Sequence, residues 1–143
     1  MDNNYKKVVI YTDGIYDLFH RGHVESFKYC KSMYPNVHLI VGVFSDKNAT
    51  GYKRPPVYCE EDRYELVSTN KWVDEVILDC PFIVSKELME QYNIDLVVHG
   101  FSNPSDSSKQ EDFFKYPKEI NKFMEIPYYS KISTTDIIKK INL

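Results

Sequence analysis

Several features that would place a protein in other classes are missing from this chain of 143 residues. Its longest apolar stretch, about residues 39–44, is far too short to cross a bilayer, and the polar segment Met1–Asn4 does not resemble a signal peptide. Basic residues are not in excess, since the formal net charge is −3, and this argues against a nucleic-acid partner. The 3 cysteines have no paired spacing, which indicates free thiols in a reducing compartment. We therefore expect a cytoplasmic protein with no membrane segment of its own.

Glycine is also scarce, and no Gly-x-Gly-x-x-Gly follows the first apolar run, which argues against a nicotinamide dehydrogenase. The remaining composition, 43% hydrophobic and 27% charged, is typical of one globular domain over residues 1–143. Apolar runs alternate with helical patterns. We expect strands near 8–10, 37–43, 73–78, 94–98 and 124–126, and helices over 21–33, 60–69, 86–92, 111–121 and after 133. This alternation predicts an α/β fold with a doubly wound parallel sheet.

Three parts of the chain are expected to depart from regular structure. Residues 44–59 are polar and carry Lys53 and Arg54, so they are a candidate lid over the strand ends, where open α/β sheets bind ligands. Residues 102–110 are rich in turn formers and predict a mobile loop. Pro117 is expected to interrupt the helix around it.

The strongest functional signal is the segment from Tyr11 to His23, between the first strand and the first helix. Gly14 allows a sharp exit from the strand, and His20 and His23 lie near the helix start, where unpaired N–H groups and the helix dipole favour an anion. Gly22 leaves room for a ligand to approach the backbone. Three interpretations of the histidines stay open on the residues alone. They are a metal site, for which further ligands are missing, a structural role, and phosphate chemistry by imidazolium groups.

The pattern Gly14-x-Tyr16-Asp17-x-x-His20-x-Gly22-His23 resembles the signature of the His-x-Gly-His nucleotidyltransferases, in particular the cytidylyltransferases that make CDP-ethanolamine and CDP-choline. Later segments agree in order along the chain, from residue 8 to residue 141: 51–57, 61–64, 71–76, 95–100 and 132–136. The resemblance implies a single-domain, Rossmann-like nucleotidyltransferase fold. It also implies transfer of CMP from CTP to a phosphorylated amino alcohol, with Mg²⁺ accompanying the nucleotide, and a homodimer.

The resemblance further implies roles for individual residues. The catalytic residues would be His20, His23 and Lys53. CTP would be bound by residues from three parts of the chain: Thr12, Asp13, Gly14, Ile15, Phe19, Gly22, His99, Gly100, Ile132, Ser133, Thr134 and Thr135. The phosphorylated acceptor would lie against Asp17, Lys53, Trp72, Phe82 and Phe101. No metal ligand is assigned.

The chain departs from the family pattern in its terminal motif, where Tyr128 stands at the position of the family's arginine and Lys131 at that of its glycine. Lys131 is a candidate for the missing positive charge, although it cannot make a bidentate contact. Phe82, and Gly100 after the strand-end histidine, are closer to the ethanolamine type, so phosphoethanolamine is the expected acceptor. Phosphocholine, glycerol 3-phosphate and a nucleotide-binding module without catalysis remain alternatives.

Overall fold

The computed structural model describes residues 5–142, so Met1–Asn4 and Leu143 lie outside the described residues. Five parallel strands form one sheet in the order β3-β2-β1-β4-β5. The strands are β1 Val8–Gly14, β2 Val37–Val43, β3 Glu75–Leu78, β4 Leu96–His99 and β5 Phe123–Glu125. The helices are α1 Arg21–Ser32, α2 Asp46–Tyr52, α3 Glu60–Ser68, α4 Lys86–Gln91, α5 Pro104–Lys109, the 3₁₀ helix η1 Glu111–Phe114, α6 Lys115–Glu119 and α7 Thr134–Ile141. The doubly wound parallel α/β sheet is confirmed.

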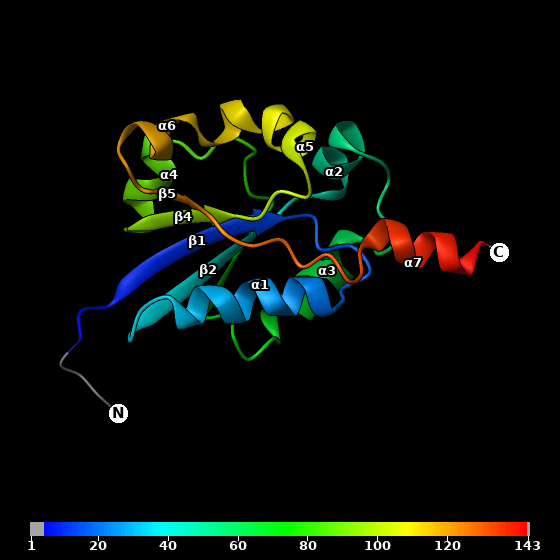
Figure 1. Ribbon diagram of the computed structural model, residues 1–143, viewed down its shortest axis with the longest axis horizontal. Helices are drawn as coiled ribbons and strands as arrows, with labels where there is room; N and C mark the ends of the chain where they lie inside the picture. Colours follow the sequence, from blue (N-terminus) through cyan, green and yellow to red (C-terminus); the bar gives the residue numbers. More distant parts are fainter. Residues whose placement is uncertain (1–4, 143) are drawn as a thin grey trace.

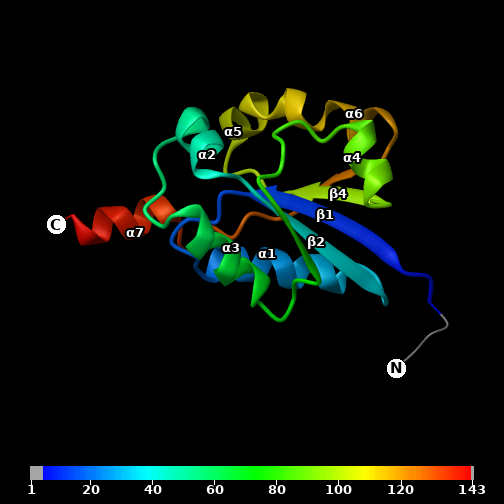
Figure 2. The ribbon, with the colours of Figure 1, turned by 180° about the vertical axis from the view of Figure 1, so that it is seen from behind.

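Helices cover both faces of the sheet. In Figure 1, α1 and α3 lie on one face and α2, α4, α5 and α6 on the other, while α7 extends past the sheet's end, and Figure 2 shows the same layers from behind. Side chains alternate along the strands to fill both layers. On β1, Ile10 packs in a cluster with Phe27 of α1, whereas Val9 and Tyr11 pack in a second cluster with Leu88 of α4. Burial on both faces explains why the central strands β1, β2 and β4 are largely apolar.

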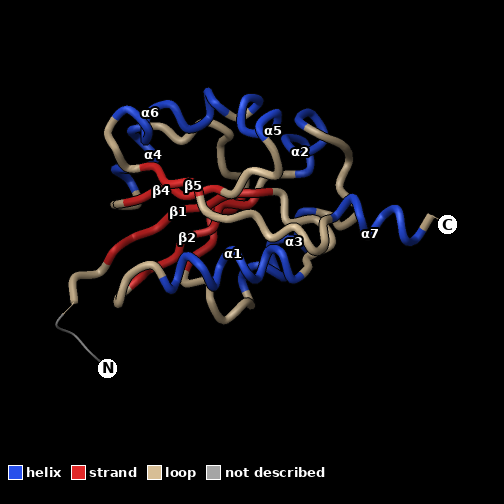
Figure 3. The backbone as a smooth tube through the Cα atoms, viewed as in Figure 1, coloured by secondary structure: helices blue, strands red, loops and turns tan. Residues whose placement is uncertain are grey.

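The functional edge of this sheet is the one where the strands end. The helices α1, α2, α5 and α7 follow β1, β2, β4 and β5, so their first turns gather at the carboxyl edge (Figure 3). The strand order reverses between β1 and β4, which are hydrogen-bonded neighbours although two strands and four helices lie between them in the chain. Ligands of open α/β sheets bind at such a switch point, and the free N–H groups of helix starts add sites for anions.

The prediction of a mobile loop over residues 102–110 is wrong, because most of this segment forms α5. Asn103 caps the helix by accepting a hydrogen bond from the Asp106 N–H at 2.8 Å, and Pro104 occupies the first turn. Residues that favour turns are also those that favour helix starts, so composition alone did not separate the two.

The connection over residues 44–59, the candidate lid, contains a helix that the sequence did not indicate. This helix is α2, which Ser45 caps through a bond from the Asn48 N–H. The helical segment 111–121 is interrupted near Pro117, as predicted, since the 3₁₀ helix η1 ends at Phe114 and α6 begins at Lys115. Pro117 lies in the first turn of α6, where its missing N–H would have had no helical partner. Among residues 5–142, no helix has both the length and the apolar character needed to span a bilayer.

Candidate active site

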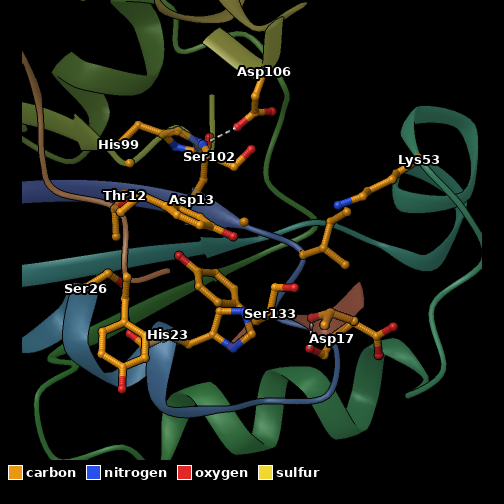
Figure 4. A pocket seen from close by; sticks show the side chains of 18 of the residues that line it. Thr12, Asp13, Asp17, His23, Ser26, Lys53, His99, Ser102, Asp106 and Ser133 are labelled. Carbon is orange, nitrogen blue, oxygen red and sulfur yellow. Dashed lines mark hydrogen bonds and ion pairs between the residues drawn. The ribbon is translucent and has the colours of Figure 1, made fainter. Parts of the chain in front are cut away.

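A cavity of about 490 Å³ opens at the carboxyl edge of the sheet, and its volume is in the range of small-molecule sites. Its wall contains fourteen of the residues assigned from the sequence: Thr12, Asp13, Gly14, Ile15, Asp17, His20, Gly22, His23, Lys53, His99, Gly100, Ser133, Thr134 and Thr135. Figure 4 shows ten of the lining residues labelled, with Asp13 and His99 on one side, His23 and Ser133 on another, and Lys53 reaching in from the α2 side. The structure thus brings together segments that are far apart in the chain.

The first turn of α1 fixes both histidines. His20 is the N-cap, and its Nδ1 accepts a hydrogen bond from the Gly22 N–H at 3.0 Å. The Nδ1 of His23 accepts from the His20 N–H at 3.1 Å, which completes a capping box and leaves the ring centroids 4.0 Å apart. Because a backbone N–H can only donate, both Nδ1 atoms are unprotonated, and each neutral ring carries its proton on Nε2.

The expected imidazolium pair is therefore corrected to a pair of neutral imidazoles. Burial, followed by the neighbouring His20, lowers the pKa of His23 to about 3. Burial also lowers the pKa of His20, against an opposing effect of Asp136. At neutral pH each ring offers an Nε2–H hydrogen bond instead of a full charge. Preorganised neutral donors of this kind stabilise oxyanions that form during a reaction.

The two glycines of the loop make room for side chains. A Cβ at Gly22 would lie 2.7 Å from Cε1 and 3.0 Å from Nδ1 of His20, so the missing side chain leaves room for that ring. A Cβ at Gly14 would lie 2.9 Å from the Tyr16 ring. Past the exit from β1, the left-handed backbone falls on Tyr16, with φ 59°, and Leu18, with φ 46°. Such strain in non-glycine residues is typical of functional loops.

Asp17 holds this loop against the connection that follows α2. Its buried carboxylate accepts three backbone hydrogen bonds, from Leu18 N–H at 3.1 Å, Val57 N–H at 2.8 Å and Tyr58 N–H at 2.9 Å. Its main-chain carbonyl accepts a bond from the Thr134 hydroxyl at 2.9 Å. These bonds make Asp17 a residue that positions the walls of the cavity, which it also lines.

Arg63 is a second organising residue, and it had no assigned role in the sequence-based prediction. It is fully buried, and its guanidinium donates to four oxygens of the surrounding loops: Ile15 O at 2.7 Å, Phe44 O at 2.8 Å, Tyr58 O at 3.2 Å and Asp46 Oδ1 at 2.8 Å. The sequence contained one indication that Arg63 is buried. Arg63 lies four residues before the apolar Val67, so both fall on the same face of the helix predicted over 60–69, and both are buried in the structure.

Asp13 and His99 lie beside each other at the ends of β1 and β4. The His99 Nδ1 is 3.6 Å from the Asp13 Oδ1, which is too long for a hydrogen bond. Asp13 is only 5% exposed, and within residues 5–142 neither its Oδ2 nor the His99 Nδ1 has a hydrogen-bond partner. A buried carboxylate with an unused acceptor in a cavity wall suits a cationic or donor group of a ligand and disfavours a phosphate at that point.

Cations gather on the α2 and α5 side of the cavity. Lys53, Arg54 and Lys109 all line it, whereas Lys131, the predicted source of compensating charge, is not among the lining residues. Partial burial, followed by Arg54, lowers the pKa of Lys53. In the part of the chain that the structure describes, none of the three lining cations makes an ion pair within 4.0 Å.

These features agree with the comparison to known protein families. A family model described as cytidylyltransferase-like matches residues 11–140. The chain belongs to this family. The match covers both histidines, the cationic segment after α2 and the start of α7, which are the parts that form the cavity.

Curated members of the cytidylyltransferase-like family are similar over 95% of this chain. Choline-phosphate cytidylyltransferase 2 of Arabidopsis thaliana is 39% identical, with 45% of its length covered, and choline-phosphate cytidylyltransferase of Saccharomyces cerevisiae is 40% identical, with 32% covered. Ethanolamine-phosphate cytidylyltransferase of Mus musculus is 32% identical, with 33% covered. The chain therefore spans less than half the length of these relatives.

A solved structure shows the same fold. The lipopolysaccharide core biosynthesis protein from Thermoplasma volcanium GSS1 matches with a TM-score of 0.67 at 22% sequence identity. The match covers 86% of this chain and 98% of the other. At this identity the likeness concerns the arrangement of helices and strands alone.

Five residues assigned by the resemblance to cytidylyltransferases lie outside the cavity wall: Phe19, Trp72, Phe82, Phe101 and Ile132. Phe19 and Phe101 lie behind it, because Phe19 stacks on His23 at 5.3 Å and Phe101 contacts His99 at 4.8 Å between ring centroids. Phe82 stacks on Phe113 at 5.3 Å. Trp72 precedes β3, at the amino edge of the sheet, and packs against the core beneath α1 and α3.

Other residues of this family member reach the cavity without having been assigned from the sequence. Besides Arg54 and Lys109, they include a group of polar and aromatic side chains: Ser26, Tyr52, Ser102, Asp106, Tyr128 and Tyr129. Most belong to segments predicted as irregular, where periodicity gives no facing direction. Two signals were present in the sequence. Tyr128 stood at a family site position, and Arg54 lay beside Lys53 in the candidate lid.

Proposed function

We propose that the chain is a cytidylyltransferase that transfers CMP from CTP to a phosphorylated amino alcohol and releases pyrophosphate. One observation carries the proposal. Two neutral imidazoles at the start of α1 share a cavity with the Ser133-capped start of α7, and the hydrogen bond from Thr134 to Asp17 joins the two sides. Two helix starts and two fixed Nε2–H donors suit a chain of phosphates.

In the proposed reaction, a phosphate oxygen of the acceptor attacks the α-phosphorus of CTP while the bond from that phosphorus to the bridging oxygen of pyrophosphate breaks. A phosphomonoester has a second pKa near 6, so it is mostly dianionic at neutral pH and needs no general base. The work of the protein is positioning and stabilisation of charge. His20 and His23 donate to phosphoryl oxygens, the first turn of α7 receives the triphosphate, and Lys53 neutralises phosphate charge from the facing side.

Asp13 supports an acceptor with a positively charged group. Its unpaired, buried carboxylate oxygen can accept from the ammonium of phosphoethanolamine, and it can attract the quaternary ammonium of phosphocholine without a hydrogen bond. Phosphoethanolamine remains the acceptor expected from the sequence. Phosphocholine is the second candidate, because the choline-phosphate relatives from Arabidopsis thaliana and Saccharomyces cerevisiae are 39% and 40% identical, against 32% for the ethanolamine-phosphate relative.

The test is release of pyrophosphate from CTP and Mg²⁺ in the presence of phosphoethanolamine, phosphocholine or glycerol 3-phosphate, each in turn. We expect turnover with one of the two amino alcohols and loss of about 2–4 kcal/mol of transition-state stabilisation in His20→Ala or His23→Ala. Binding of CTP without release for any acceptor would favour a nucleotide-binding module. Near-normal turnover in both histidine variants would remove the assigned mechanism.

Mg²⁺ is proposed as a companion of the nucleotide and not as a resident of the protein. Within residues 5–142 no group of three or more His, Cys, Asp or Glu side chains could hold a metal ion, so the residues present do not fit a protein-built metal site. Mg²⁺ is commonly bound through substrate phosphates.

A cytoplasmic location and a homodimer are also proposed. The location is supported by Cys30, Cys59 and Cys80, which are all free thiols. Fractionation of cells tests the location, and sedimentation of the purified chain tests the dimer.

A further inference from the structure

The proposed reaction leaves part of the cavity wall unexplained. Lys53 has a role in it, but Arg54 and Lys109 line the same cavity from two different connections of the chain. The Arg54 Nε is a buried donor atom without a hydrogen-bond partner among the described residues. A buried donor that no protein group satisfies, in the wall of a cavity, indicates an acceptor supplied by a ligand.

The ammonium of Lys109 makes no ion pair with Asp106, the acidic residue of its own helix. Asp106 lies three residues earlier on α5, a spacing at which ion pairs form on helices. Its Oδ2 instead accepts the Ser102 N–H at 3.1 Å and its Oδ1 accepts the Gln110 Nε2 at 2.8 Å. Asp106 therefore shapes the start of α5, and the Lys109 ammonium has no carboxylate within 4.0 Å in the described chain.

The balance of charge across the cavity shows what these cations would meet. The rest of the wall supplies neutral imidazoles, hydroxyls, helix N–H groups and the uncharged Tyr128. It also holds the carboxylates of Asp13, Asp17 and Asp106, which add no positive charge. A nucleoside triphosphate together with a phosphomonoester brings several negative charges into the site. Neutral donors alone leave most of that charge uncompensated, so full positive charges on the opposite wall have a definite partner.

We propose that Lys109, with Arg54, is a further phosphate-binding residue of this site, and that it completes with Lys53 a cationic wall opposite the two histidines. Lys109 supplies from α5 a charge that the terminal motif lacks at Tyr128. This inference rests on the proposed function for the identity of its ligand. The bound group is a phosphate, belonging either to the nucleotide or to the acceptor.

The test compares Lys109→Gln, Lys109→Arg and Arg54→Gln with the unaltered protein, by calorimetric titration of CTP alone and of the phosphorylated acceptor alone at low and moderate salt. Loss of a charge-assisted hydrogen bond is expected to weaken binding of one ligand about tenfold and to reduce its salt dependence. Lys109→Arg is expected to retain binding, because it keeps the charge. An effect confined to CTP assigns the triphosphate, and one confined to the acceptor assigns the phosphomonoester.

Lys115→Gln is the matched control, since it removes the same charge from an exposed position in α6 outside the cavity wall. It is expected to bind both ligands as the unaltered protein does. Unchanged binding of both ligands by Lys109→Gln, or an equal loss in Lys115→Gln, overturns the proposal. These titrations need no turnover, so a protein that binds CTP but releases no pyrophosphate would fail the proposed function while the role of Lys109 is still decided.

Discussion

The hydroxyl of Thr134 donates to the main-chain carbonyl oxygen of Asp17 at 2.9 Å, across 117 residues of chain. This bond joins the start of α7 to the loop between β1 and α1. The carboxylate of the same aspartate holds Val57 and Tyr58, so one residue couples the histidine loop, the segment after Lys53 and the last helix. The relative positions of the three proposed phosphate-binding elements therefore depend on a few hydrogen bonds at Asp17.

Thr134→Val tests the link between α7 and the loop. The substitution keeps the shape of the side chain and removes its donor, which is expected to cost about 1 kcal/mol of stability. Because the start of α7 would then be less well fixed, we expect KM for CTP to rise with a smaller change in kcat. Thermal unfolding and steady-state kinetics measure the two effects, and Thr134→Ser should restore both.

Thr69→Val is the control for Thr134→Val. The Thr69 hydroxyl bonds to Glu65 O at 3.0 Å, within the end of α3 and outside the cavity. It is expected to change stability slightly and to leave KM for CTP as it was. An unchanged KM in Thr134→Val would show that the bond does not position the helix.

Arg63→Lys tests the second organising residue. Lysine keeps the charge but not the planar arrangement of donors, so at least one loop carbonyl is left without its bond in a fully buried place. We expect a loss of about 2–4 kcal/mol in the free energy of unfolding and a fall in activity. Chemical denaturation measures the first, with the exposed Arg21→Lys as a control that should unfold as the unaltered protein does.

The parts of the fold that could be predicted are those with local patterns. The apolar run of β2 and the helical spacing of α1 and α3 predicted the bounds of these elements to within two residues at either end. The Ser-x-x-Asp start of the last helix was also readable, since Ser133 accepts the Asp136 N–H at 3.1 Å. The helices α2 and α5 were missed, because their polar sequences contain residues that start helices as well as turns.

The residues of the candidate site could be predicted where they belong to a sequence motif. They could not be predicted where their positions depend on tertiary packing. The bonds from Asp17 and Arg63 to distant loops join residues that no local spacing relates. The neutral state of His20 and His23 follows from burial, which the sequence did not show. The aromatic residues Trp72 and Phe82 came from resemblance alone, and in the structure they contribute to packing outside the cavity wall.

The pKa of His23 predicts how stability depends on pH. Its pKa is about 3 in the folded chain, whereas an unfolded histidine has a pKa near 6.5. Between these values the unfolded chain binds a proton that the folded chain does not, so the free energy of unfolding falls as pH drops below about 6.5. Urea unfolding from about pH 8 to pH 5 should show this slope, and His23→Gln should show less of it.

His38→Gln is the control for the pH series. The His38 Nε2 lies 3.0 Å from Glu75 Oε1 near the start of β2, away from the cavity. Its variant is expected to retain the loss of stability in acid that the unaltered protein shows. An equal slope in His23→Gln and the unaltered protein would contradict the burial of a neutral His23 ring.

Gly22→Ala is expected to change activity much more than stability. The substitution stabilises the helix but displaces the His20 ring, so its two effects on stability oppose each other. Alanine favours a helix over glycine by about 1 kcal/mol, and Gly22 lies in the first turn of α1. The added Cβ, however, would lie 2.7 Å from Cε1 of His20, so the ring must move and give up its bond from the Gly22 N–H. We expect thermal stability to change little while kcat falls about 100-fold, the scale of losing one preorganised donor.

Gly51→Ala is the matched control, since a Cβ there meets no atom within 4 Å, and it should keep full activity. Normal turnover in Gly22→Ala would mean that the position of the His20 ring is not needed for catalysis.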